Sequence, residues 1–227
     1  MQSLIFGPVF AGFQELLDGA WVTIFLTLQA IVIGTFVATT CAWLRTSGPK
    51  PLKWAVMAYV EIIRNTPFLL QLFFFFFGLP SLGLRLTTLQ TALLAMVVNL
   101  GAYATEIIRA GIEAIPHGQT EAGSALGLNK LQVFLLIILL PALQIVYPPL
   151  AAQYTMVLLG SSLASAISAN ELTSAANVMA AHNFRTLEVY IVVTFMYLVI
   201  VFVFRGIFAI VYNLVLARGR DQRMKVL

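Results

Sequence analysis

The chain has 227 residues, of which 60% are hydrophobic and only 10% are charged. Soluble domains carry about 25% charged residues, so this composition excludes a water-facing body and makes the lipid bilayer the main solvent. The formal charge of +4 is modest, and most basic residues lie beside apolar runs, which favours membrane orientation over nucleic-acid binding. Cys41 is the only cysteine, which excludes an intrachain disulfide and a thiolate metal cluster.

The first two apolar stretches are long enough to cross a bilayer, whose core takes about 20 helical residues. The first runs from Trp21 to Leu44, and the linker 45–53, with two prolines and three basic residues, is expected on the cytoplasmic side. The second runs from about Val56 to Leu79. Within it, Pro67 disfavours a helix at the preceding residue and removes a backbone donor, so we expect a break there.

Three further spans are expected, about Leu89–Ile108, Leu143–Leu163 and Leu187–Tyr212. The apolar run 131–163 is too long for one simple span. We expect Pro141, Pro148 and Pro149 to break it and to leave 129–140 as a helix near the interface, although two short spans would also fit and would invert the C-terminus. The small, polar segment 161–186 is expected to be a partly re-entrant outer loop.

The distribution of basic residues sets the orientation. With the N-terminus outside, the two outer loops hold Arg85 and Arg185 alone, whereas nine basic residues lie inside. These nine are Arg45, Lys50, Lys53, Arg109, Lys130, Arg218, Arg220, Arg223 and Lys225. The positive-inside rule then predicts an outside N-terminus and a cytoplasmic C-terminus. Together with the apolar stretches, this indicates an all-α membrane protein with about five spans and a single domain over residues 1–227.

No catalytic constellation is visible in the sequence. His117 and His182 have no partner at ligand spacing, which indicates solvated loop residues. No G-x-x-x-x-G-K-[S/T] run is present, so any ATP-driven step would need a phosphate loop on another chain.

The stretch 115–130 is the longest part that reads as a surface feature. Ile115-Pro116 ends the third span, Gly118 is suited to an N-cap, Glu121 would lie in the first helical turn, and Gly127 is suited to a C-terminal stop. A helix of two turns is unstable alone in water and must pack on something. Its small residues suit either an ordinary interhelical turn or insertion into a partner's groove, and these two readings stay open at this point.

Six short motifs resemble one family of membrane proteins, and five of them match one branch of it. E-A-G-x-x-x-G at 121–127 is similar to the EAA motif of ABC-importer permeases. P-x-G-Q at 116–119, A-Y-x-x-E-I-I-R at 102–109, E-I-I-R-N-T-P-F-L-L-Q at 61–71, Y-P-P-L at 147–150 and S-S-L-A-S-A-I at 161–167 resemble the branch for polar amino acids, the histidine/glutamine type. The chain departs from the pattern at Gly123, where alanine is usual, at Pro141, which comes one residue late, and at Gly160, where an acid is frequent.

The resemblance implies a bacterial inner-membrane permease that is not itself an enzyme. Its partners would be a second permease chain, identical or related, two cytoplasmic ATPase subunits that hold ATP and Mg, an extracytoplasmic amino-acid-binding protein and membrane lipid. No cofactor is expected in this chain. The short helix would insert into the ATPase, and the expected coupling residues are Gly118, Glu121, Ala122, Gly123, Gly127 and Leu128.

Polar residues inside the spans are the candidates for the substrate path, because charges at membrane depth cost about 2.5–3.5 kcal/mol each and should face protein or water. We expect structural pairs between Glu61 and Arg64 and between Glu106 and Arg109. The path candidates are Thr66, Asn99, Gln153, Gly160 and Ser161. Because neither residue 153 nor residue 160 is acidic, we expect neutral or acidic amino acids as substrates in preference to basic ones.

Two other functions are compatible with the residues alone. A small secondary transporter would use an ion gradient, with Glu61 or Glu106 as a proton relay, and a homodimer would supply its second half. A membrane scaffold without transport activity is the other. Uptake that needs only this chain and an ion gradient would identify the secondary transporter. Uptake that is unchanged by Glu121 substitutions would favour the scaffold.

Overall fold

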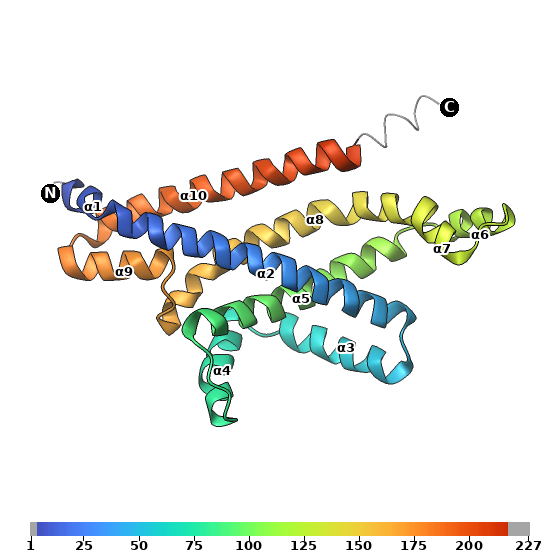
Figure 1. The fold of residues 1–227 in the computed structure, drawn as a ribbon, viewed down its shortest axis with the longest axis horizontal. Coiled ribbons are helices and arrows are strands. Elements are labelled where there is room, and N and C mark those ends of the chain that lie inside the picture. The colour runs from blue at the N-terminus through green and yellow to red at the C-terminus, as the bar shows by residue number, and fades with distance from the viewer. Residues whose placement is uncertain (1–3, 218–227) are drawn as a thin grey trace.

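The computed structural model describes residues 4–217, and these fold into helices and connecting turns without a β-strand. The molecule is elongated, with the N-terminal helix and α9 at one end and α6 at the other (Figure 1). The α-helices are α1 (Gly7–Ala11), α2 (Phe13–Ser47), α3 (Lys50–Arg64), α4 (Phe68–Ser81), α5 (Thr88–Glu113), α6 (His117–Ala125), α7 (Lys130–Val133), α8 (Leu139–Gly160), α9 (Leu172–Asn183) and α10 (Thr186–Val211). A π-helical turn (Phe134–Ile138) joins α7 to α8, a 3-10 helix (Ser161–Ile167) follows α8, and a second π-helical turn (Tyr212–Ala217) follows α10.

The central helix of the fold is α5, which buries a larger share of its apolar stretch than any other candidate span among the described residues. It begins at a capping box in which the Thr87 hydroxyl accepts from the Gln90 backbone N–H and the Gln90 side chain accepts from the Thr87 N–H. Apolar residues of α2, α4, α8 and the 3-10 helix pack around it, with Leu100 and Leu72 wholly buried. A second apolar cluster joins α1, α2, α9 and α10.

The predicted second span is two helices with a sharp bend. The axes of α3 and α4 meet at 109° at the Pro67 break, as the sequence predicted. Neither helix alone reaches across a bilayer, since 15 residues at 1.5 Å each span only about 22 Å. Four other helices in the described part of the chain are long and apolar enough to cross, so the count is four spans, or five if the bent pair makes one crossing.

The prediction that three prolines break the fourth apolar run was wrong. The chain runs as a continuous helical segment from Leu136 to Ile167, with Pro148 and Pro149 inside α8. Membrane helices tolerate proline because neighbouring helices pack against the weakened turn. The π-helical turn at Phe134–Ile138 lies directly before α8, and Pro141 is the third residue of α8. Because Pro141 has no N–H, it already interrupts the α-helical hydrogen-bond pattern of this turn.

The predicted outer loop is mostly helical, and a buried carboxylate fixes it to the spans. Glu171 is wholly buried at the N-cap of α9, where its side chain accepts from the Ser174 N–H at 2.8 Å, from the Tyr197 hydroxyl at 2.8 Å and from the Thr23 hydroxyl at 3.4 Å. Burial raises the pKa of the Glu171 carboxyl. Because these donors come from α2, α9 and α10, the segment is tied to two spans, and its depth in a membrane stays a prediction.

Close packing at Gly19 leads to a stability prediction. A Cβ at Gly19 in α2 would lie 2.9 Å from the Leu172 Cα, a backbone atom that cannot move aside. Gly19→Ala should therefore destabilise the protein by about 1–3 kcal/mol, the range for overpacking. Gly206→Ala is the matched control, because a Cβ there meets nothing within 4 Å. Thermal unfolding of the two purified variants checks this, and an equal melting temperature would contradict the packing argument.

Candidate functional site

The helix α6 projects at one end of the molecule, remote from α9 (Figure 1). Its N-terminus differs from the prediction. The residue before the helix is Pro116, with ψ 132°, so Gly118 lies inside the first turn and is not the N-cap. Glu121 consequently lies beyond the first turn, where its charge gains less from the helix dipole than we expected.

The end of α6 agrees with the predicted glycine stop. Gly127 has φ 79°, its N–H donates to the Ser124 carbonyl at 3.0 Å, and the Leu128 N–H donates to the Gly123 carbonyl at 3.2 Å. This pair of bonds is a Schellman motif, which requires a left-handed residue at position 127 and so favours glycine there.

The residues expected to contact a partner divide between two faces of α6. Gly123 faces inward, since a Cβ there would lie 2.5 Å from the Ile137 Cδ1 and 3.0 Å from a methyl group of Val133. Glu121 and Ala122 are exposed, Leu128 is half-buried, and Leu126 is 80% exposed. The sequence reasoning passed over Leu126, which lies directly before the helix stop at Gly127.

Three of the five predicted path residues meet in one small cavity between α4, α5 and α8. We call it the Asn99 cavity. Its volume is about 130 Å³, and its lining is Phe68, Met96, Asn99, Gln153, Met156, Val157, Gly160 and Leu163. Ligand sites usually have 300–1,000 Å³, so this cavity accepts only part of an amino acid unless a facing surface completes it.

The other two path candidates lie outside the lining of this cavity. Ser161 is wholly buried, and its hydroxyl donates to the Leu158 carbonyl at 2.7 Å. Thr66 is exposed, and its hydroxyl donates to the Ile62 carbonyl at 2.9 Å. The Thr66 carbonyl accepts from the Gln71 side-chain amide at 3.0 Å.

Gln71 connects the bend of the broken span to the cavity. Its amide nitrogen also donates to the Ile63 carbonyl at 2.7 Å, and its amide oxygen accepts from the Asn99 nitrogen at 2.9 Å. The sequence alone did not distinguish a substrate contact by Asn99 from an interhelical hydrogen bond. In the structure, Asn99 makes the interhelical bond to Gln71 and also lines the cavity. The sequence reasoning did not identify Gln71 as a site residue. A signal was present, because Pro67, four residues earlier, leaves backbone carbonyls without their helical partners, and a side-chain amide can donate to them.

A cluster of four charged residues joins α2 to the end of α5 that leads into α6. Glu106 pairs with both Arg45 and Arg109, and Arg109 pairs with Glu113. The Glu106–Arg109 pair was expected, whereas its extension to Arg45, 61 residues away, has no signal in local spacing. The cluster therefore fixes the end of α5 that leads into α6 against α2.

The expected pair between Glu61 and Arg64 is absent from the ion pairs of the described residues. The Glu61 carboxylate accepts from the Asn65 side chain at 3.1 Å, and the Arg64 guanidinium lies 5.6 Å from the centre of the Tyr103 ring. Both side chains are exposed on the α3 surface, so water competes with the pairing and weakens it.

Residues 6–216 match the family model described as a binding-protein-dependent transport system inner membrane component. The chain is 36% identical over 198 residues to the L-cystine transport system permease protein TcyB of Bacillus subtilis, covering 87% of this chain and 82% of that one. It is 32% identical over 214 residues to the glutamine transport system permease protein GlnP of Escherichia coli, covering 93% and 94%. Among solved structures, an amino acid ABC transporter with histidines aligns with a TM-score of 0.87 at 29% identity, over 93% of this chain and 99% of that one.

Proposed function

Because this chain belongs to the family of binding-protein-dependent transport system inner membrane components, and is a multi-pass permease subunit of an amino acid ABC importer, we propose that it carries neutral or acidic amino acids. The Asn99 cavity supports the preference for these over basic amino acids. None of the described residues that line it is charged, and its polar groups are the amides of Asn99 and Gln153. A cationic side chain would lose its hydration there without gaining an anion, which is unfavourable.

In this proposal, ATP and Mg are held by a separate ATPase, and α6 is the element that the ATPase moves. Glu121 and Ala122 are exposed and Leu126 is 80% exposed, so α6 presents a free surface on which an ATPase could dock. The charge cluster at Glu106 would transmit the movement of α6 to α2 and α5. ATP binding must favour one arrangement of these helices over the other for any shift to occur.

A second permease chain is also part of the proposal. The Asn99 cavity is too small for a whole amino acid, so a facing copy or relative would complete it. A binding protein would deliver the amino acid at the outer end, where α9 lies. The choice between an identical and a related second chain is decided by co-purification from the native membrane.

Reconstitution into vesicles tests the proposed function. ATP-driven uptake of L-glutamine should require this permease, its ATPase and its binding protein together. Uptake that needs only this chain and an ion gradient would establish secondary transport and overturn the proposal, and unchanged cellular uptake of every amino acid after Glu121→Ala would favour the scaffold.

Gln153→Glu tests the substrate class. A carboxylate in the Asn99 cavity would pair with a cationic side chain, so the binding of L-arginine to the purified permease–ATPase complex should strengthen about tenfold, equivalent to about 1.4 kcal/mol. Gln153→Met, neutral and of similar size, is the matched control and should leave arginine binding weak. Titration calorimetry measures both, and a wild-type complex that binds L-arginine as tightly as L-glutamine would contradict the proposed preference.

A further inference from the structure

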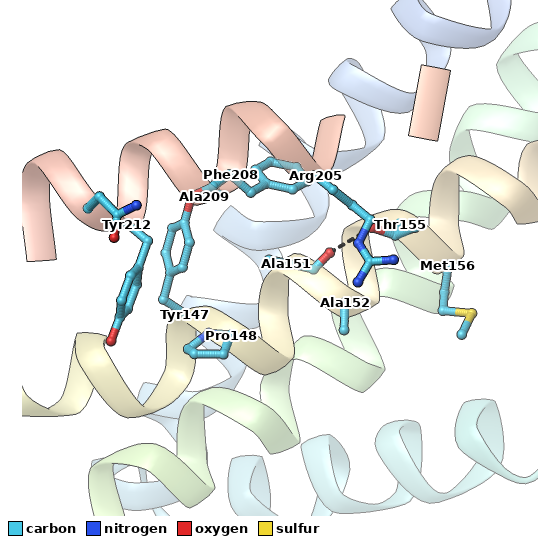
Figure 2. Close-up of a pocket in the computed structure, with 11 residues that line it drawn as sticks. Tyr147, Pro148, Ala151, Ala152, Thr155, Met156, Arg205, Phe208, Ala209 and Tyr212 are labelled. Carbon is cyan, nitrogen blue, oxygen red and sulfur yellow. Dashed lines mark hydrogen bonds between the residues drawn. The ribbon is translucent and has the colours of Figure 1, made fainter. Parts of the chain in front are cut away.

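A larger recess lies between α8 and α10, and we call it the Arg205 recess. Its volume is about 540 Å³, within the range of sites that hold a whole small molecule. Figure 2 shows the Arg205 side chain reaching from α10 toward α8, where it ends beside Ala152 and Thr155. The lining is Tyr147, Pro148, Ala151, Ala152, Thr155, Met156, Arg205, Phe208, Ala209, Tyr212 and Asn213.

This recess adjoins the Asn99 cavity along α8. Met156, which is 64% exposed, lines both spaces and forms the boundary between them. Gln153 and Gly160 line the Asn99 cavity, whereas Tyr147 and Ala151 line the recess, which is therefore nearer to the start of α8 and to α6. Six residues separate Gln153 from Tyr147, about 9 Å along the helix axis. The cavity faces α4 and α5 whereas the recess faces α10, so a molecule that leaves the cavity past Met156 on the α6 side would meet the recess next.

The walls of the recess are held together by specific contacts. The Tyr147 hydroxyl donates to the Phe208 carbonyl at 2.8 Å, and the Gln144 amide donates to the Leu216 carbonyl at 2.8 Å. The Tyr147 and Tyr212 rings lie 5.7 Å apart. These contacts fix α8 against α10 at the α6 end, while alanines at 151, 152 and 209 leave the space between them open.

Arg205 is the only charged residue among the described residues that line the recess. It is exposed on α10, a helix otherwise dominated by apolar residues, six positions before the helix ends at Val211, and charged residues within spans are costly and rare. Such residues face a bundle interior or a water-filled space and mark pathways. The planar guanidinium suits a carboxylate, which it can bind with two parallel hydrogen bonds.

We propose that the Arg205 recess is a second, inner subsite of the permeation path, where Arg205 binds the α-carboxylate of the amino acid after it leaves the Asn99 cavity. This inference rests on the proposed function and deepens it. Every amino acid carries the α-carboxylate, so this subsite tolerates different side chains, and the uncharged Asn99 cavity makes the selection.

Cysteine labelling in vesicles tests the subsite directly. Cys41 is first replaced by serine, and Ala209→Cys is introduced in the recess, with Ile210→Cys, exposed on α10 but outside the lining, as the control position. A sulfonate-bearing thiosulfonate reagent should label position 209 faster than a trimethylammonium-bearing one. Arg205→Gln should slow the anionic reagent and speed the cationic one by about fivefold each, and so lower the ratio of the two rates roughly 25-fold, as expected for one unit charge at about 4 Å in water, whereas Arg205→Lys should preserve the ratio.

Protection by ligand identifies the group that is bound. L-glutamine should slow labelling at position 209 in the Arg205 background, whereas 4-aminobutanamide, the same molecule without its α-carboxylate, should not. Slow labelling by both reagents at position 209 would mean that lipid or the second permease chain fills the recess, and equal protection by both compounds would mean that the carboxylate is not recognised. Either result overturns the proposal.

Uptake in the same vesicles separates this inference from the proposed function. Arg205→Gln should reduce ATP-driven L-glutamine uptake about tenfold while the ATPase still co-purifies, and Arg205→Lys should restore most of it. Wild-type vesicles that show no ATP-driven uptake would refute the proposed function. Normal uptake by wild type and by Arg205→Gln alike would refute the subsite alone.

Discussion

Gly127→Arg is expected to reduce ATP-driven uptake at least tenfold while the permease still inserts into the membrane. The backbone at position 127 has φ 79°, and a residue other than glycine in this conformation costs about 1–2 kcal/mol. The strain would open the Schellman bond from the Leu128 N–H to the Gly123 carbonyl, and a long cation would be added beside the exposed Leu126. Co-purification of the ATPase and uptake in vesicles measure the effect.

Gly127→Asn is the matched control for this prediction. Asparagine tolerates the left-handed conformation and adds no charge, so this variant should retain most of its uptake and its ATPase. A Gly127→Arg variant with normal co-purification and normal uptake would show that α6 is an ordinary turn. An equal loss in both variants would show that any side chain at this position disturbs docking, and that strain and charge are not the causes.

The elements of the fold that could be predicted are those set by local chemistry. Pro67 predicts a break because it lacks an N–H and restricts the residue before it, and the structure bends there by 109°. Gly127 predicts a helix stop because the Schellman motif needs a left-handed residue. The apolar stretch that became α5 was found by its length and composition alone. The same local reasoning failed at Pro148 and Pro149, where packing against neighbouring helices outweighs the loss of two N–H donors.

The parts of the site that could not be predicted depend on residues far apart in the chain. Thr23 donates to Glu171 across 148 residues, and nothing near Glu171 in the sequence indicates that its carboxylate is wholly buried. Arg205 lies in the last apolar stretch of the sequence, where no local pattern assigns it a partner. Its position in the recess between α8 and α10 follows from how these two helices pack, which periodicity does not specify.

Glu106→Ala should destabilise the permease by about 2 kcal/mol and lower its melting temperature by roughly 4–8 °C. This variant leaves the cations of Arg45 and Arg109 without the carboxylate on which both converge. Breaking a fully buried pair costs about 3–5 kcal/mol, but these side chains are about one-fifth exposed, so solvent screening reduces the loss. Thermal unfolding of the purified permease measures the change.

Glu113→Ala is the matched control because it removes another carboxylate of α5 that also pairs with Arg109. The Glu113 side chain is 56% exposed and pairs with Arg109 alone, so its loss should cost less than about 1 kcal/mol. ATP-driven uptake should follow the same order, since Glu106 joins α5 to α2 while Glu113 lies at the helix end. If Glu113→Ala lowers the melting temperature and the uptake as much as Glu106→Ala does, the ion pair between Glu106 and Arg45 contributes nothing. Packing alone would then hold the end of α5 against α2.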